Sequence, residues 1–332
     1  MHNTLIITIL IVFLVIIFDF INGFHDTATA VATSITTRAL SPTKAILICS
    51  IFNFMGAFTG TAVAKTVGEN IVSHTSIPQW VILGVLVSAI LWNLITWYFA
   101  IPSSSSHALI GSLVGGGIAY TCRLNVVNWY NLFHDIIMWI FIAPVIGFTA
   151  GYILMILLNW ILKPFKLRII NKLFLKLQVI AGALMAFNHG GNDAQKSMGM
   201  ITMALLSGGF ISTFEVPTWV IVCCASAMAL GTSIGGKKII KTMGSGMAKL
   251  TPVNGFAAQT GAAAVILMAT SFHAPVSTTH IISTTVMGVG ASKRLKSVKW
   301  GVAKNIVWAW VLTIPITAGL SALIITIIKL FL

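Results

Sequence analysis

Three of the six acidic residues lie in two stretches that are otherwise strongly apolar, where a charged side chain is costly to keep. Asp19 and Asp26 occupy the segment 4–36, and Asp193 occupies the segment 174–207. A carboxylate held in an apolar medium indicates a site that needs a negative charge or a proton. The candidate ligands of a cation offer oxygen atoms at and near these positions: Asn22, Asp26, Thr29, Asn192 and Asp193. Helix capping by the aspartates is the simpler alternative.

Two runs of hydroxyl side chains each follow a proline and end in a histidine, Pro102-Ser-Ser-Ser-Ser-His107 and Pro275-Val-Ser-Thr-Thr-His280. A proline halts one helix, and hydroxyls together with the free N–H groups of the next helix suit a tetrahedral oxyanion such as phosphate or sulfate. The candidate anion ligands are hydroxyls of both runs and two neighbours of the aspartates: Ser103, Ser104, Ser105, Ser277, Thr278, Thr279, Thr27 and Gln195. Ordinary Ser/Thr capping is the alternative.

Four of the eight histidines adjoin these motifs. His25 and His189 stand beside the aspartates, while His107 and His280 close the hydroxyl runs. Histidine titrates near neutral pH, so these four are candidates for a proton relay, with structural hydrogen bonding and direct contact with the anion as alternatives. Lys196 follows the second aspartate and could balance its charge, attract the anion or extend outward to water.

Glycines next to the aspartates predict that the two long segments are broken in the middle. Gly23 precedes Asp26, and Gly190 and Gly191 precede Asp193. Glycine tolerates an unwound backbone, and a half-helix that restarts after a break presents unpaired N–H groups that bind anions.

The prolines predict that one structural unit is written twice. Eight of the nine fall into two matching sets, in which Pro42, Pro78, Pro102 and Pro144 recur as Pro217, Pro252, Pro275 and Pro315. The offsets shrink only from 175 to 171 residues. In an apolar chain, paired interrupted segments are the best sequence indication of a transporter's binding site.

Composition places these motifs in a membrane. The chain is 57% hydrophobic and 8% charged, with a mean hydropathy of +0.97, whereas soluble domains carry about 25% charged residues. We therefore expect an all-α integral membrane protein with 10–12 helical segments. The net charge of +14 lies in short loops, which argues against a nucleic-acid partner, and the four cysteines lack the spacing of metal ligands.

We predict two units of five crossings, residues 1–161 and 177–332, joined by a basic linker at 162–176. The fourth segment of each unit, 106–122 and 277–291, is short enough to be a re-entrant hairpin. Lysine and arginine concentrate in alternate loops, which predicts that those loops face the cytoplasm and that both termini lie outside. Because five is odd, the second unit enters the membrane inverted relative to the first.

The chain resembles the inorganic phosphate transporter (PiT) family, in particular its bacterial low-affinity phosphate permeases. Five motifs carry the resemblance, in order along the chain: Ile21-Asn-Gly-Phe-His-Asp-Thr-Ala-Thr-Ala-Val-Ala32, Trp92-Asn-Leu-Ile-Thr-Trp97, Pro102-Ser-Ser-Ser-Ser-His107, His189-Gly-Gly-Asn-Asp-Ala-Gln-Lys196 and Pro275-Val-Ser-Thr-Thr-His280. The resemblance implies import of phosphate across the bacterial cell membrane by a homodimeric symporter driven by H⁺ or Na⁺. It implies no cofactor, although a divalent metal travels with phosphate in bacterial members.

The family's pattern also implies roles for individual residues. Cation and substrate coordination fall on Asp26, Asn192 and Asp193, and phosphate contact falls on Ser104, Ser105, Thr278 and Thr279. One departure concerns Thr29, which stands where the family usually has asparagine and so removes a carbonyl oxygen from a sodium site. Together with the histidines, this favours H⁺ over Na⁺ as the coupling ion. The sequence leaves the metal dependence and the dimer interface open.

Two other functions compete with phosphate symport. A sulfate permease on the same scaffold would use nearly the same ligand shape, and a membrane-embedded hydrolase or transferase could use the Asp, His and Ser side chains. The duplication of the site argues against catalysis, because alternating access needs pseudo-symmetric halves and an enzyme does not.

Overall fold

The computed structural model describes residues 2–72, 77–101, 103–234 and 250–331, except for the side chains of residues 2, 3, 27–29, 302 and 305. The predicted ligands Thr27 and Thr29 therefore lie outside the described side chains. The described part is helical throughout and contains no strand beyond one isolated bridge, Val72–Val127. Six of its helices are long and apolar enough to cross a membrane, which confirms the all-α membrane class.

The helices of the first half are α1 (His2–Thr36), α2 (Pro42–Gly56), α3 (Ala62–Gly68), α4 (Gln79–Tyr98), α5 (Ser105–Thr121), the single turn α6 (Trp129–Asn131) with a π-turn at Leu132–Ile137, and α7 (Met138–Leu162). The second half contains α8 (Leu167–Ser207), α9 (Thr218–Ile234), α11 (Pro252–Ser271), α12 (Thr278–Ala291) and α13 (Trp300–Phe331). Pro42 and Pro252 open α2 and α11 from the first turn, where the missing N–H costs nothing.

The predicted breaks in the two long segments are wrong. Helix α1 runs unbroken through Gly23, and α8 runs unbroken through Gly190. The glycines instead allow close helix packing: a Cβ on Gly23 would lie 2.3 Å from the carbonyl oxygen of Met228, and one on Gly190 would lie 2.2 Å from that of Asn53. The helix N-termini expected at these breaks are therefore not formed.

Helices α4 and α5 form a first helix hairpin, and α11 and α12 form a second. The second helix of each hairpin begins within a hydroxyl run, as the prolines predict. Ser104 caps α5 by accepting the backbone N–H of His107 at 3.2 Å, and Ser277 caps α12 by accepting that of His280 at 3.4 Å. Both hairpins turn through a left-handed residue at the same place, Ala100 at φ 55° and His273 at φ 59°. The local structure of the two motifs is thus the same.

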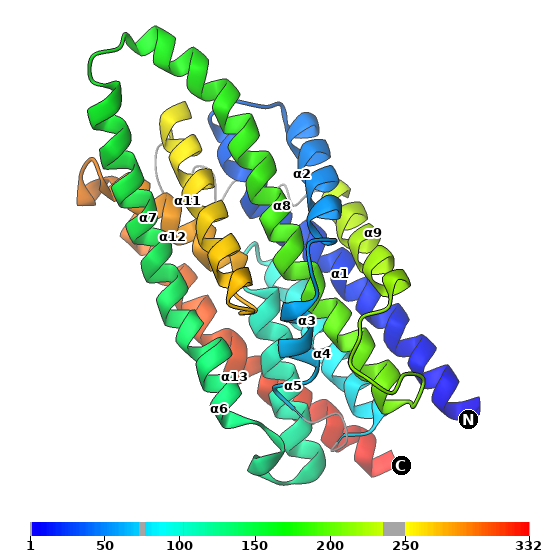
Figure 1. Ribbon diagram of the computed structural model, residues 1–332. Coiled ribbons are helices and arrows are strands. Elements are labelled where there is room, and N and C mark those ends of the chain that lie inside the picture. Colours follow the sequence, from blue (N-terminus) through cyan, green and yellow to red (C-terminus); the bar gives the residue numbers. More distant parts are fainter. Residues whose placement is uncertain (1, 73–76, 102, 235–249, 332) are drawn as a thin grey trace.

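Each hairpin returns to the end of the molecule from which it starts (Figure 1). Trp80 at the start of α4 packs edge-on against Tyr120 at the end of α5, with ring centroids 5.4 Å apart. In the second hairpin, Val253 at the start of α11 and Val289 near the end of α12 share one hydrophobic cluster. Neither α5 nor α12 is long enough to be among the six candidate spans, so five crossings per unit remain a prediction.

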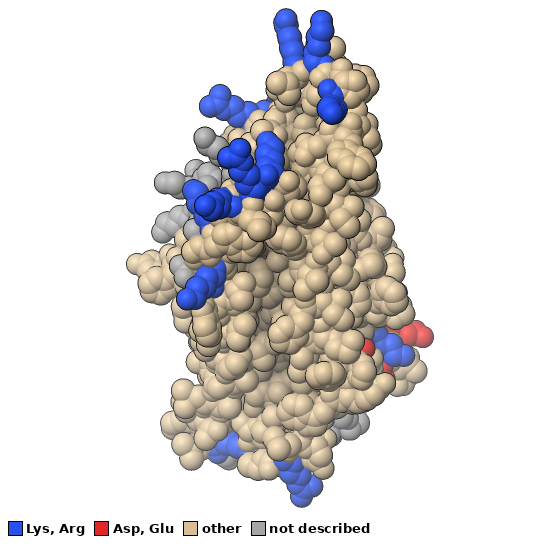
Figure 2. All heavy atoms as spheres, turned by 90° about the vertical axis from the view of Figure 1, so that its left-hand side faces the viewer, with Lys and Arg blue, Asp and Glu red and all other residues tan. Residues whose placement is uncertain are grey.

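The two termini lie at one end of the molecule, and the connection from α7 to α8 lies at the other (Figure 1). Figure 2 shows Lys and Arg gathered at the end that carries this connection. The connection is shorter than the predicted linker, because α8 already begins at Leu167 and only residues 163–166 separate the helices. With 41 residues, α8 is about 60 Å long, so its basic first turns can extend beyond a bilayer core of about 30 Å.

Candidate ion and anion site between the hairpin tips

The carboxylate of Asp26 is buried on α1, where it contacts His25 of the same helix and Ser105 of α5. Its Oδ1 lies 2.7 Å from Nδ1 of His25, whose other ring nitrogen lies 3.2 Å from the Thr96 hydroxyl near the end of α4. The Ser105 hydroxyl at the start of α5 lies 2.7 Å from Oδ2 of Asp26 and 2.8 Å from the Asn22 amide oxygen. The first hairpin tip is therefore fastened to α1 by polar contacts.

The carboxylate of Asp193 is equally buried on α8 and has two partners on its own helix. Nζ of Lys196 lies 2.5 Å from Oδ1, and Nε2 of His189 lies 3.3 Å from Oδ2. Spacings of three and four residues put all three side chains on one face of the helix. The Thr278 hydroxyl at the start of α12 donates to Oδ2 at 3.2 Å. The ammonium of Lys196 is 2% exposed, so the reading in which it extends to water is wrong.

The contacts between the halves cross over. The Thr279 hydroxyl of the second hairpin donates to Oδ1 of Asp26 at 3.3 Å. Lys196 of α8 donates to the Ser106 hydroxyl of the first hairpin at 2.5 Å and to the backbone carbonyl of Val276 at 2.7 Å. The hairpin tips also touch each other, since the Ser106 hydroxyl donates to the same carbonyl at 3.3 Å. Asp26 therefore contacts a hydroxyl of the second half directly, and Asp193 is linked to a hydroxyl of the first half through the ammonium of Lys196.

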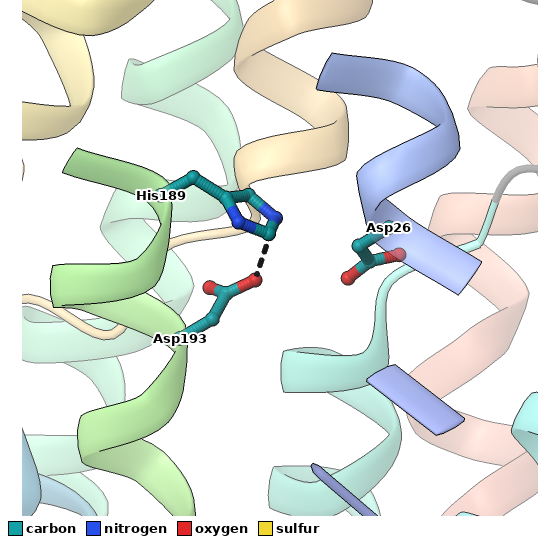
Figure 3. Close-up of side chains that lie close together, drawn as sticks. All are labelled: Asp26, His189 and Asp193. Carbon is teal, nitrogen blue, oxygen red and sulfur yellow. Dashed lines mark ion pairs between the residues drawn. The ribbon is translucent and has the colours of Figure 1, made fainter. Parts of the chain in front are cut away.

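Three potential metal ligands meet in this place (Figure 3). One atom each of Asp26, His189 and Asp193 lies within 4.8 Å of the others, and all three residues are buried. Two carboxylates at this distance repel each other unless a proton or a cation lies between or beside them. Two oxygens and one imidazole nitrogen form a donor set that borderline divalent metals accept. Lys196 is one positive partner of this pair of carboxylates, and it lies on the side of Asp193.

The histidines that end the hydroxyl runs face each other at the hairpin tips. The ring centroids of His107 and His280 lie 4.6 Å apart at a steep angle, and His280 stacks on Trp310 at 3.9 Å. Nδ1 of His107 and Nε2 of His280 have no hydrogen-bond partner among the described residues. These rings therefore pack against each other and against Trp310.

Some predicted anion ligands are engaged elsewhere. Ser103 donates to the Thr96 hydroxyl at 2.9 Å, and the Ser104 and Ser277 hydroxyls cap their helices. The amide of Gln195 accepts the backbone N–H of Val63 at 2.9 Å and donates to a carbonyl of its own helix at 2.6 Å. These four side chains fix the hairpins and α3 rather than join the carboxylates in this conformation.

Asn192 holds the second hairpin. Its amide nitrogen donates to the Thr270 hydroxyl at 2.9 Å and to the Ala274 carbonyl at 3.1 Å, just before the hydroxyl run. Its amide oxygen has no hydrogen-bond partner among the described residues, so it keeps one acceptor for an ion or a water.

Three contacting residues were absent from the predicted set. Ser106 belongs to the same hydroxyl run as the predicted ligands Ser103, Ser104 and Ser105, and Thr96 lies inside the Trp92–Trp97 motif. The position of each residue in a motif therefore indicated a place near the site. Asn53 on α2 lies 3.1 Å from Nδ1 of His189 and fixes that ring, but nothing in the sequence around it indicated the role.

Comparison with known sequences matches this chain to one family. The family model described as "Phosphate transporter family" matches residues 22–170 and again residues 163–321. The chain is 50% identical over 326 residues to a probable low-affinity inorganic phosphate transporter of Bacillus subtilis, covering 97% of each protein. A relative with the same description from Rhizobium meliloti is 45% identical over 314 residues, 92% of each, and one from Mycobacterium leprae is 39% identical over 332 residues, 99% of this chain and 80% of the relative.

Comparison with solved structures supports the fold independently. A protein described as "The sodium-dependent phosphate transporter" superposes with a TM-score of 0.89, covering 98% of this chain and 100% of its own. The two sequences are 24% identical, so the match shows a shared arrangement of helices.

Proposed function

Because the chain belongs to the phosphate transporter family, we propose that it imports inorganic phosphate as a symporter that draws on a cation gradient. The family consists of transporters and not of enzymes, so the hydrolase alternative is set aside. Of the two coupling ions considered, we propose H⁺ rather than Na⁺.

The observation that carries the proposal is that hydroxyls of both hairpin tips already bind the two buried carboxylates. The hydroxyls of Ser105, Thr278 and Thr279 are each within hydrogen-bond distance of a buried carboxylate. A hydroxyl has one proton to donate, so it can bind an anion only by releasing the carboxylate. Asp193 keeps its ion pair with Lys196 when its hydroxyl leaves, whereas Asp26 loses the hydrogen bonds of Ser105 and Thr279 and then favours binding of a cation or a proton, because a poorly solvated buried charge is costly. Anion binding and cation binding are thereby coupled.

The same geometry favours phosphate over sulfate. At neutral pH phosphate carries protons and can donate a hydrogen bond, whereas sulfate only accepts. Asp26 and Asp193 are acceptors placed beside the hydroxyls, so they suit an anion that also donates. A divalent metal that travelled with the phosphate would find ligands in the same two carboxylates and His189.

A third buried carboxylate supports protons as the coupling ion. Asp19 lies on α1 with no exposed surface, accepts the Ser197 hydroxyl of α8 at 2.5 Å, and forms no recorded ion pair with any described residue. Its second oxygen has no hydrogen-bond partner there. Burying a single carboxylate charge costs several kcal/mol, of order 3–5 when its partner is missing, whereas the neutral acid costs far less. We therefore expect Asp19 to hold a proton during part of the cycle.

Replacing Asp19 with Asn tests this role. The titratable groups around it are Asp193 and Lys196 on α8 and Cys224 on α9, and all of them remain in the variant. We expect Asp19→Asn to keep phosphate exchange across the membrane but to lose at least tenfold of the uptake driven by a pH gradient. Radiolabelled phosphate in proteoliposomes measures both. Glu215→Gln at an exposed carboxylate is the matched control. Full pH-driven uptake in a well-inserted Asp19→Asn protein would refute the assignment.

We further propose that the chain lies in the bacterial cytoplasmic membrane as a homodimer, with its halves as inverted repeats and both termini outside. The basic end formed by the α7–α8 connection supports this orientation, since loops rich in Lys and Arg stay in the cytoplasm. The double match of the family model supports the repeat.

The purified chain in proteoliposomes tests the function directly. We expect uptake of radiolabelled phosphate that rises with an inward proton gradient, falls with a protonophore and is competed by excess phosphate but not by sulfate. Uptake driven by an inward sodium gradient at equal pH, and untouched by the protonophore, would replace H⁺ by Na⁺ and leave phosphate transport standing. No phosphate uptake under either gradient would refute the function.

A further inference from the structure

The ammonium of Lys196 is surrounded by oxygen atoms in the way that a small cation is coordinated in a binding site. Three oxygen atoms surround its Nζ: a carboxylate oxygen of Asp193 at 2.5 Å, the hydroxyl oxygen of Ser106 at 2.5 Å and the carbonyl oxygen of Val276 at 2.7 Å. A protonated lysine has three N–H groups, and three acceptors satisfy all of them. The side chain is 3% exposed, so water does not take part in balancing its charge.

The three oxygens come from three separate elements. Asp193 belongs to α8, Ser106 to the first turn of α5, and Val276 to the tip between α11 and α12. Carboxylate, hydroxyl and backbone carbonyl are oxygen ligands of the kind that hard cations accept. A dissociable ion in this place would join both hairpin tips to α8, and Lys196 makes that junction with a cation that cannot leave.

The other carboxylate has no equivalent lysine in its sequence. The residue three positions after Asp193 is Lys196, whereas the residue three positions after Asp26 is Thr29, which carries no charge. The partner of Asp26 on its own helix is the imidazole of His25. One carboxylate of the pair therefore has a lysine ammonium beside it on its own helix, and the other has an imidazole.

We propose that Lys196 is a tethered cation that permanently fills the cation position at Asp193, so that this position binds no dissociable Na⁺ during transport. The proposal rests on the proposed function only for its transport measurements. Its direct consequence is that removing the lysine side chain opens an oxygen-lined position of one negative charge. Small monovalent cations should then bind where the wild-type protein ignores them.

Thermal unfolding of the purified full-length chain tests the binding without any transport. In NaCl against choline chloride of equal concentration, we expect the wild-type Tm to stay constant. Lys196→Ala should unfold at a lower temperature in choline and regain at least about 3 °C in saturating Na⁺, because a ligand of the folded state alone stabilises it. Lys196→Gln is measured in parallel, so a folding defect of one variant does not decide the outcome.

Two controls sharpen the result. The double variant Lys196→Ala with Asp193→Asn removes both charges and should lose the response to Na⁺. Lys329→Ala removes an exposed lysine that contacts the Tyr120 carbonyl at the end of α5, and its Tm should be the same in both salts. A sodium response of the wild type equal to that of Lys196→Ala, or no response in either Lys196 variant, would overturn the tethered cation.

Phosphate uptake at equal pH provides the second measurement. Wild-type uptake should be the same in Na⁺ and choline, while Lys196→Ala should be nearly inactive in choline and recover at least tenfold with external Na⁺ or methylammonium. If the wild type transports no phosphate, the proposed function fails and the Tm comparison still decides the cation position. If the wild type transports phosphate but Na⁺ stimulates it and neither cation restores Lys196→Ala, the tethered cation is wrong and phosphate transport stands.

Discussion

Asp193→Asn should abolish phosphate uptake and should destabilise the protein more than Asp26→Asn. The substitution leaves the buried ammonium of Lys196 with neutral oxygens only, and breaking a buried ion pair by removing one partner costs about 3–5 kcal/mol. The neighbour of Asp26 is the imidazole of His25 rather than a lysine ammonium. We expect uptake to fall at least a hundredfold in both variants, and Tm to fall further in Asp193→Asn.

The measurements are initial uptake in proteoliposomes and Tm of the purified variants, each corrected for the amount of inserted protein. Glu69→Gln provides the matched control, because the partly exposed Glu69 pairs with the exposed Lys65 at 3.7 Å, and surface pairs contribute about 1 kcal/mol or less. Near-normal uptake by either well-inserted aspartate variant would show that the two carboxylates do not take part in coupling.

Gly190→Ala should prevent recovery of folded protein. The added Cβ would lie 2.2 Å from the carbonyl oxygen of Asn53 and 2.6 Å from its Cα, and these backbone atoms cannot turn away as a flexible side chain could. Overpacking in a well-packed interior costs about 1–3 kcal/mol and more when backbone must move, so we expect the upper end. Displacement of α2 would also disturb Asn53, whose side chain fixes His189.

Gly319→Ala is the control for this prediction. It makes the same substitution inside α13, where nothing lies within 4 Å of the added atom, and alanine favours a helix over glycine by up to about 1 kcal/mol. Size-exclusion profiles and Tm in detergent compare the two variants. A Gly190→Ala protein as stable as Gly319→Ala would contradict the close packing of α2 on α8 and would favour the unwound backbone that the sequence suggested.

The close packing at Gly190 separates the features that the sequence could predict from those that it could not. Apolar segments, prolines and hydroxyl runs act locally, so the helical class and the helix starts at Ser105 and Thr278 could be predicted, whereas capping by Ser104 and Ser277 was the alternative to the anion binding that we expected of them. Glycine does not act in one way only: it permits an unwound turn and equally permits a helix to touch another, and Gly190 is the second case. The sequence favoured the first because it shows no partner helix.

The crossing of contacts between the halves could not be predicted for a related reason. Thr279 of the second hydroxyl run hydrogen-bonds Asp26 of the first half, and Ser106 of the first run binds Lys196 of the second half. The two hydroxyl runs resemble each other, so their sequences do not distinguish these contacts. Which hydroxyl reaches which carboxylate depends on how the two hairpin tips pass each other. That arrangement depends on packing across the whole molecule, and it cannot be predicted from the composition and spacing of one motif.

The distance along the chain between Asp26 and Thr279 has a consequence for synthesis. The two residues are 253 positions apart, and ribosomes add about 5–20 residues per second, so α1 enters the membrane roughly 13–50 s before its last partner exists. During that interval its carboxylate relies on what has already been made. His25 is adjacent to Asp26, and Asp193 has Lys196 within one turn of its own helix. Asp26 and Asp193 thus each enter the lipid with a partner on the same helix, and the second hairpin later adds the hydroxyl donors of Thr278 and Thr279 to carboxylates that already have one.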